Sequence, residues 1–278
     1  MSKEILMLII IVLIALQIIK EGYLKGFINE FCKTLIEYKK IVIIGVVLTL
    51  FSIVYLDLPI ARKFSNKYYA KTLQGIENGT RIATVDEIIE LKKKIKVENI
   101  KKEKYSKYER FLAHQGDGDV TIASIIIILL AGSLLKKKKL IKICKNAIVS
   151  VIASGILVNL IKYIVSRLRP DVNMLPYQFF SWASWFNGNE SINPFHSSSA
   201  SFPSGHAIVS VAVASSFYFG YKNKMIRSFA FILAVILSGS RIYGTRHWLS
   251  DIISAGFLGV LVAKTIYEIN KKKINLQN

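Results

Sequence analysis

Two side chains that can share a proton lie four residues apart near the end of the chain, His247 and Asp251. If the apolar segment after His247 is a helix, both lie on one face and the carboxylate can accept a hydrogen bond from the imidazole N–H. Arg241, just before Gly244, could fold over the same place and bind a phosphate through its planar fork of donors. The alternative is an ordinary surface pair, which contributes only about 0.2–0.5 kcal/mol.

A second group of cations ends an apolar segment. Lys162 and Arg169 are seven residues apart, which predicts that they share a helix face two turns apart, and Pro170 ends that helix. Snorkelling to the headgroup layer would account for Arg167 or Arg169. Lys162 would lie about 10 Å deeper at 1.5 Å per residue, where a cation is a candidate for function.

A third group opens another apolar segment, with the order Ser204, Gly205, His206. Ser204 is suited to cap a helix, whose free N–H groups and positive dipole end predict an anion site. Gly205 would let the anion approach the backbone, and His206 would stand at the edge of the site. His196 lies in a Ser-rich stretch that suggests no partner, and we interpret it as structural or exposed.

The chemistry of these groups depends on the apolar segments around them. The chain has 278 residues, of which 52% are hydrophobic, and a net charge of +20, with a mean hydropathy of +0.40. Its lysines interrupt apolar runs, which is typical of loops between membrane helices. A nucleic-acid partner is not indicated, because there the charge lies on a polar domain. Cys32 and Cys144 have no spacing typical of a disulfide framework or a metal site.

The segments predict an all-α, multi-pass membrane helical bundle with six core transmembrane helices and one extra N-terminal apolar helix. Residues 5–19 lack a cleavage pattern and indicate an uncleaved anchor. They are short for a core of about 30 Å, so a tilted or interfacial helix is the alternative. We expect residues 1–40 to form this anchor and a basic linker, and residues 41–278 to form the membrane domain. The six core segments are 41–56, 120–135, 140–165, 207–219, 228–237 and 252–266.

Short basic loops predict the orientation. Lysine-rich clusters at 136–145, 222–227 and 271–273 belong in the cytoplasm. The three chemical groups then face outward, and we expect a bacterial inner (cell) membrane. The segment 57–119 is also outside, although it is Lys-rich, because loops of about 60 residues lose their influence on orientation.

Two outer segments carry further interpretations. Residues 84–110 predict a helix with a capping box and a solvated charged face, or a brush against anionic headgroups. The stretch from His114 to Asp119 could suggest a metal site, but an Asp before an apolar run is more simply an N-cap. The aromatic residues between 177 and 186 predict an interface anchor, with a lid over lipid tails as the alternative.

Taken in order, the three groups read Lys-x6-Arg-Pro, Pro-Ser-Gly-His and Ser-Arg-x5-His-x3-Asp, and this order resembles the type 2 phosphatidic acid phosphatase family. The resemblance covers roughly residues 120–270. The N-terminal segment 5–19 and the Lys-rich segment 57–119, hereafter the charged insert, carry no family signature. The signature positions are Lys162, Arg169, Pro170, Pro203, Ser204, Gly205, His206, Ser240, Arg241, His247 and Asp251.

The resemblance implies a phosphomonoesterase or pyrophosphatase that needs no metal and no cofactor, acting on a lipid phosphate or diphosphate. His247 would attack phosphorus, Asp251 would orient its ring, and His206 would act as acid and then as base. The equatorial phosphate oxygens would be bound by side chains and backbone N–H groups. These phosphate-binding residues would be Lys162, Arg169, Arg241, Ser204 and Gly205.

Two other classes of function share some of these features. Vanadium haloperoxidases share the signature but are soluble. A non-enzymatic membrane binder or transporter of phosphorylated lipid would explain the helices and Lys162, but not two histidines beside three cations. The lipid stays open among phosphatidic acid, phosphatidylglycerophosphate, a polyprenyl diphosphate and a lipopolysaccharide anchor. The expected partners are this substrate and membrane lipids, and no protein partner is inferred.

Overall fold

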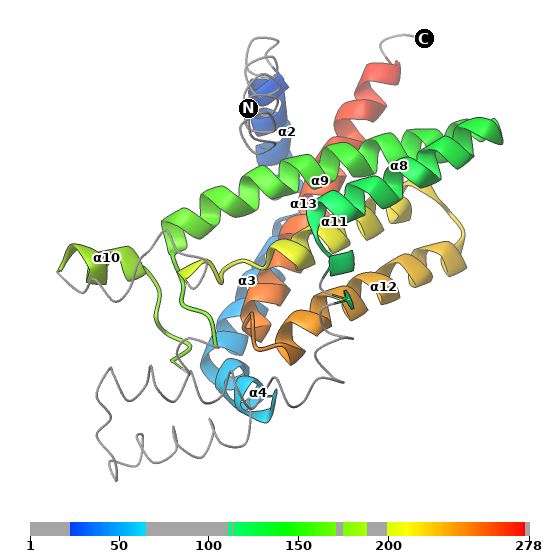
Figure 1. The fold of residues 1–278 in the computed structure, drawn as a ribbon. Coiled ribbons are helices and arrows are strands. Elements are labelled where there is room, and N and C mark those ends of the chain that lie inside the picture. Colours follow the sequence, from blue (N-terminus) through cyan, green and yellow to red (C-terminus); the bar gives the residue numbers. More distant parts are fainter. Residues whose placement is uncertain (1–22, 65–110, 113, 171–174, 188–198, 276–278) are drawn as a thin grey trace, which may run out of the picture.

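The computed structural model describes residues 23–64, 111–112, 114–170, 175–187 and 199–275 (Figure 1). Within these residues all regular structure is helical, which confirms the all-α prediction. The predicted helices at 5–19 and 84–110 lie outside the described residues. The elements are α2 (Tyr23–Glu37), α3 (Lys39–Phe51), the π-helical turn η1 (Ser52–Leu56), α4 (Asp57–Phe64), α8 (Gly118–Leu134), α9 (Lys138–Val165), α10 (Ser181–Phe186), α11 (Gly205–Gly220), α12 (Lys224–Tyr243) and α13 (Leu249–Asn275).

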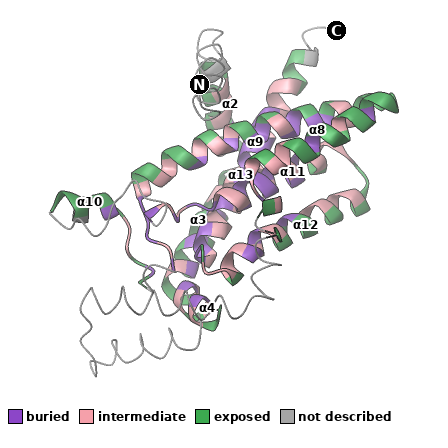
Figure 2. Ribbon diagram, viewed as in Figure 1, coloured by how far each residue is buried: buried purple, intermediate pink, exposed green. Residues whose placement is uncertain are grey.

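Every one of the six predicted core segments forms helix. Four of the described helices are long and apolar enough to cross a membrane: Lys39–Phe64, Lys138–Val165, Lys224–Tyr243 and Leu249–Lys273. Helices α8 and α11 are apolar but shorter. Large apolar side chains such as Phe229 and Val235 are exposed, and exposed residues recur along α8, α9 and α12 (Figure 2). Such faces suit a lipid environment, and the protein is an integral membrane protein.

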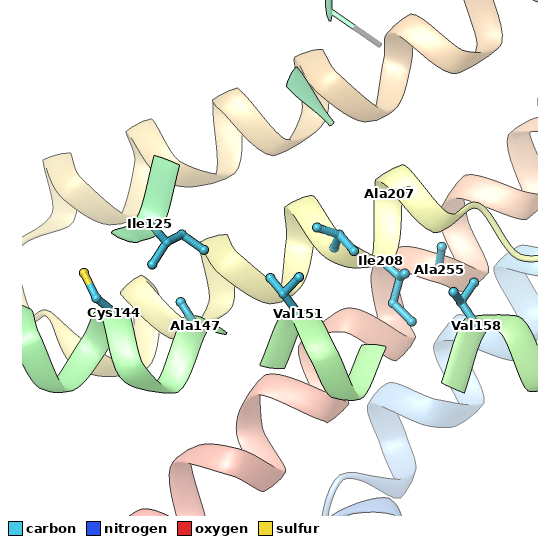
Figure 3. Packing of buried hydrophobic residues seen from close by; sticks show 9 residues of the cluster. Ile125, Cys144, Ala147, Val151, Val158, Ala207, Ile208 and Ala255 are labelled. Carbon is cyan, nitrogen blue, oxygen red and sulfur yellow. The ribbon is translucent and has the colours of Figure 1, made fainter. Parts of the chain in front are cut away.

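Helix α11 lies at the centre and packs against α9, α12 and α13. The core between these helices and α8 is built largely from small and β-branched side chains, including Ala207 and Ala255 (Figure 3). A Cβ atom on Gly259 would lie 2.7 Å from the Ile208 carbonyl oxygen, so α13 and α11 approach backbone to backbone. Small residues permit this close packing, which brings the N-terminal ends of the two helices together.

The segment interpreted as a basic linker contains helix α2. This helix packs against α13, where Thr265 Oγ1 donates to Thr34 Oγ1 at 3.2 Å and Lys272 Nζ donates to Glu30 at 2.7 Å. The structure differs from the interpretation as a linker here, because residues 23–37 form a helix without containing a continuous apolar run. A helix that packs only one face on a neighbour needs apolar residues on that face alone, so polar residues can lie between them in the sequence.

Helix α3 continues through η1 into α4, and together they form one apolar helix from Lys39 to Phe64. The expected boundary of the charged insert at Asp57 is therefore wrong, since Asp57 is fully buried inside this helix. The π-helical turn immediately before it places Ser52, whose hydroxyl donates to Asp57 Oδ1 at 3.1 Å. Such turns add one residue to a helix and re-aim the side chains that follow.

Candidate active site

The three predicted chemical groups meet where helix ends converge. At the N-terminus of α11, the Ser204 N–H donates to the Asp251 carbonyl oxygen in the first turn of α13 at 3.0 Å. Just before α11, the Ser201 N–H donates to the carbonyl oxygen of Arg167, which follows α9, at 3.0 Å. These bonds join residues that are widely separated in the sequence into one site.

His247 lies in the turn between α12 and α13, and its ring is buried. The turn folds back on α12, because the N–H groups of Arg246 and His247 donate to the Arg241 carbonyl oxygen at 3.0 and 3.3 Å. Thr245 has a φ of 52°, a left-handed conformation that L residues rarely adopt. The turn therefore aims the histidine inward toward the start of α11.

The tautomer of His247 follows from its neighbours. Its Nδ1 atom lies 2.8 Å from the Ser201 carbonyl oxygen. A carbonyl oxygen only accepts, so Nδ1 carries the proton and Nε2 carries the lone pair. Asp251 Oδ2 lies farther from Nδ1, at 3.5 Å. The predicted His–Asp pair is thus close in space, but the backbone carbonyl oxygen makes the shorter contact to Nδ1.

Asp251 is itself held by charged and neutral donors in the first turn of α13. Its Oδ2 accepts from the Ser201 hydroxyl at 2.6 Å and from the Trp248 N–H at 2.8 Å. Its Oδ1 accepts from Arg167 Nη1 at 2.6 Å. The positive end of the α13 dipole adds to these contacts. A fully buried carboxylate is therefore kept ionised beside the histidine.

Burial lowers the pKa of His247 from 6.5 to about 3, because the imidazolium would lose its hydration. Asp251 opposes this shift through its hydrogen bond and its charge, whereas the cations of Arg169 and Lys162 reinforce it. The ring is consequently neutral at pH 7. A neutral ring with its lone pair on Nε2 can act as a nucleophile.

Snorkelling was offered as an explanation for Arg167 or Arg169, but Arg167 is buried and bridges two carboxylates. Its Nη2 lies 2.7 Å from Asp57 Oδ2, and its Nη1 lies 2.6 Å from Asp251 Oδ1. Nη2 also donates to the Pro176 carbonyl oxygen at 2.6 Å. The Phe179 ring lies 4.5 Å from the guanidinium carbon. Arg167 thus ties the transmembrane helix that carries Asp57 to the carboxylate beside His247.

Ser250 completes this network. Its N–H donates to Asp57 Oδ1 at 2.8 Å, and its hydroxyl donates to Asp57 Oδ2 at 2.5 Å. Neither Asp57 nor Ser250 was predicted as part of the site. A signal for Asp57 was present in the sequence, because a carboxylate directly after an apolar segment is costly inside a membrane unless it has a partner.

The predicted shared helix face of Lys162 and Arg169 was wrong. Helix α9 ends at Val165, and Ser166 closes it with a left-handed φ of 41°. Ser166 then bonds to Ser181 through their hydroxyls, and Arg167 turns into its buried network. These tertiary bonds end the helix four residues earlier than the sequence suggested. Lys162 therefore lies in the last turn of α9 and Arg169 in the irregular segment beyond it.

The three predicted phosphate-binding cations nevertheless lie close enough for Arg169 and Arg241 to affect the charge of Lys162. Arg169 and Arg241 repel the Lys162 ammonium, and Asp251 attracts it. A Cβ atom on Gly205 would lie 3.7 Å from Lys162 Nζ, so this ammonium stands at the N-terminus of α11. Ser204 caps that helix as predicted, since its hydroxyl accepts from the Ala207 N–H at 3.5 Å. Backbone N–H groups and positive charge are thus combined at this end of α11.

His206 occupies the second position of α11, with its ring largely covered. Its Nε2 lies 3.0 Å from Oδ1 of Asp117. The sequence suggested an N-cap Asp in this stretch without selecting one; Asp117 is the N-cap residue of α8, but its side chain makes no capping hydrogen bond. The carboxylate contacts His206 instead, a contact that sequence spacing could not indicate because 89 positions separate the two residues.

The aromatic residues form an exposed group on and beside α10. Trp182 Nε1 donates to the Ile164 carbonyl oxygen at 3.0 Å, which fixes α10 to the end of α9. The rings of Phe180, Trp182 and Phe186 meet edge to face. The position suits an interface anchor, and the lid remains an alternative. His196 lies outside the described residues.

Comparison with known proteins finds a family match over part of the chain. Residues 145–275 match the PAP2 superfamily. The crystal structure of Aquifex aeolicus LpxE is similar at 18% identity and a TM-score of 0.42, covering 58% of this chain and 84% of that chain. The first transmembrane PAP2 type phosphatidylglycerolphosphate phosphatase from Bacillus subtilis is similar at 19% identity and a TM-score of 0.45, covering 82% and 96%. No curated protein matches the chain.

The matched residues run from α9 to α13 and include every predicted site residue, from Lys162 to Asp251. Asp57 and Asp117, which contact the site from elsewhere, precede the match. Residues 145–275, somewhat less than half of the chain, are thus similar to the PAP2 superfamily.

Proposed function

We propose that this protein hydrolyses a lipid phosphate or lipid diphosphate through a phosphohistidine intermediate, without a metal ion. One observation carries the proposal: His247 Nδ1 lies 2.8 Å from the Ser201 carbonyl oxygen, which places the ring proton on Nδ1 and the lone pair on Nε2. The similarity of residues 145–275 to the PAP2 superfamily supports the same chemistry.

In the first step, Nε2 of His247 attacks phosphorus and an N–P bond forms. The P–O bond to the lipid alcohol, or to the lipid phosphate, breaks on the opposite side. His206 donates a proton to the leaving oxygen. The phosphorylated ring gains positive charge, and the nearby Asp251 carboxylate stabilises that charge.

In the second step, water attacks the phosphorus of the phosphohistidine. His206, now neutral, takes a proton from this water. The N–P bond breaks, its electron pair returns to Nε2, and inorganic phosphate leaves. The same histidine thus serves as acid and then as base, and the enzyme returns to its starting state.

Charge on the equatorial oxygens is balanced by side chains in this scheme. Lys162, Arg169 and Arg241 supply three positive charges, and the Gly205 N–H and the Ser204 hydroxyl supply donors at the α11 terminus, since the Ser204 N–H already donates to Asp251. Phosphoryl transfer is catalysed mainly by such positioning and charge stabilisation. Removing one donor of this kind typically costs about 10²–10³ in rate.

We further propose that the site faces the outer side of the membrane. The distribution of lysines between the two ends of α9 and α13 supports this orientation. Lys162 and Asp251 lie at the site ends of α9 and α13, whereas exposed lysines lie at the opposite ends of both helices. Basic loops favour the cytoplasm. The substrate would then be a lipid of the outer leaflet.

The test is phosphate release by the purified protein in detergent with EDTA present. A panel of short-chain phosphatidic acid, phosphatidylglycerophosphate and a polyprenyl diphosphate would define the lipid. We expect turnover of at least one member, and its loss in His247→Gln but not in the matched variant His196→Gln. Binding of these lipids with no phosphate release would support a binder or transporter instead.

A further inference from the structure

The His206 ring meets a carboxylate from the end of the charged insert. Asp117 Oδ1 lies 3.0 Å from His206 Nε2. Because an ionised carboxylate only accepts hydrogen bonds, Nε2 carries a proton in this contact. The other ring nitrogen, Nδ1, is then the atom that can exchange a proton with a substrate.

A short turn holds Asp117 in place. The Asp117 N–H donates to the His114 carbonyl oxygen at 3.2 Å, and His114 Nδ1 lies 3.3 Å from the second carboxylate oxygen, Oδ2. The Thr121 hydroxyl, in the first turns of α8, donates to the Gln115 carbonyl oxygen at 3.3 Å. Both carboxylate oxygens of Asp117 therefore face a histidine, and the turn is joined to α8.

The backbone of the same turn lies against the His206 ring. A Cβ atom on Gly116 would be 2.7 Å from His206 Cδ2 and 3.4 Å from its Cβ and Cγ. No real Cβ could be accommodated there unless the ring moved. Gly116 therefore covers the Cδ2 edge of the His206 ring, and Asp117 contacts the adjacent nitrogen, Nε2.

From these contacts we propose that Asp117 is a positioning residue for His206, and that the protein uses a second histidine–carboxylate pair in addition to His247 and Asp251. Asp117 fixes the ring through Nε2–H, so that Nδ1 gives its proton to the leaving oxygen and later takes a proton from water. Asp117 stays ionised throughout. This inference rests on the proposed phosphatase function, because it assigns a partner to the acid of that reaction.

The surroundings favour this role over a purely structural one. The Asp117 side chain is 44% exposed, and ion pairs at such sites contribute little to stability. It also makes no capping bond to α8. A carboxylate close to a phosphate site is unfavourable unless a cation lies between them. The protonated His206 ring is such a cation at the moment when the leaving oxygen needs a proton.

The first test compares two leaving groups. A lipid phosphate leaves as an alkoxide that needs a proton, whereas an activated aryl phosphate does not. We expect Asp117→Asn to lower kcat about 10–100-fold on short-chain phosphatidic acid and less than about 3-fold on the aryl phosphate. Asp119→Asn, an exposed carboxylate two residues away, should match the wild type on both. Equal losses on both substrates, or no loss on either, would overturn the role of Asp117.

A second test uses the two glycines that flank Asp117. Gly116→Ala must displace the His206 ring, whereas a Cβ on Gly118 meets nothing within 4 Å. We therefore expect Gly116→Ala to show the same leaving-group dependence as Asp117→Asn, and Gly118→Ala to behave as wild type. Wild-type kinetics in Gly116→Ala would show that the turn does not position the ring.

A third measurement is independent of turnover. The chain has four histidines, so ring ¹⁵N signals can be assigned in detergent with single substitutions. Asp117→Asn should shift the Nε2 signal of His206 and leave the signals of His247 unchanged. Unchanged His206 signals would overturn the pairing. If the wild type hydrolyses no phosphate substrate, the proposed function fails, and these spectra still decide whether the pair exists.

Discussion

Arg167 offers the sharpest test of how the site is held together, because two buried carboxylates share its guanidinium. The side chains of Arg167, Asp57 and Asp251 are all fully covered. Removing one partner from a buried ion pair costs about 3–5 kcal/mol. For a chain of this size each kcal/mol lowers the unfolding midpoint by about 2–4 °C, so Arg167→Met should lower it by about 6–20 °C.

The assay is thermal unfolding in detergent followed by tryptophan fluorescence. Trp248 is a suitable reporter because its ring is buried 5.2 Å from the guanidinium carbon of Arg167. Arg246→Met is the matched control, since Arg246 is exposed on the same turn as His247. Its midpoint should shift by no more than about 2 °C, because exposed substitutions usually stay within about 0.5 kcal/mol.

A double variant tests whether Asp57 and Asp251 share the charge of Arg167. Arg167→Met leaves both carboxylates without their cation, and adding Asp57→Asn removes one of these uncompensated charges. The double variant should therefore be less destabilised than the sum of the two single variants, by about 0.5–3 kcal/mol. Strictly additive losses, or a midpoint for Arg167→Met close to wild type, would refute the shared-cation account.

Three further predictions concern the phosphate site, its pH dependence and its sidedness. Lys162→Met should lose about 10²–10³ in turnover and Lys162→Arg only part of that; wild-type turnover in Lys162→Met would remove Lys162 from the site. The pKa of His247 is about 3 in the folded protein and near 6.5 when unfolded, so only the unfolded chain binds its proton between these values. Stability should therefore fall as pH drops from 6.5 toward 3, by about 2 kcal/mol at pH 5, and His247→Gln should reduce this fall; an equal fall in both proteins would contradict it. In a Cys32→Ser background, an impermeant thiol reagent applied to intact cells should label Asn187→Cys and not Asn223→Cys, whereas the reverse would place the site in the cytoplasm.

Apolar periodicity was sufficient to locate the membrane helices but not where they end. Residues 140–165 were predicted as one apolar segment, and α9 does end at Val165. Arg169 was nevertheless assigned to the same helix, because no local signal shows that Ser166 adopts a left-handed conformation. Its buried bonds to distant residues favour that conformation. Helix α2 was missed for a related reason, since its helical state depends on packing against α13.

Residue types and spacing propose the candidate site residues, because His247 and Asp251, or Ser204 and His206, are only four or two positions apart in the sequence. The residues that contact these site residues could not be predicted in the same way. Asp57 is 110 residues from Arg167, and only the packing of several helices decides that they meet. The Ser201 carbonyl oxygen that selects the His247 tautomer has no sequence signal, because every residue carries such an oxygen.

The central claim is that His247 carries the phosphoryl group. The most direct measurement is to quench the protein within one turnover of a ³²P-labelled substrate and to locate the label on the chain. A His206→Ala variant with an activated aryl phosphate should accumulate label, because the first step needs no acid while the attack of water has lost its base. We predict an acid-labile, base-stable label on the peptide that contains His247, and none in His247→Gln. Turnover with no label on the protein, or full activity in His247→Gln, would contradict the account.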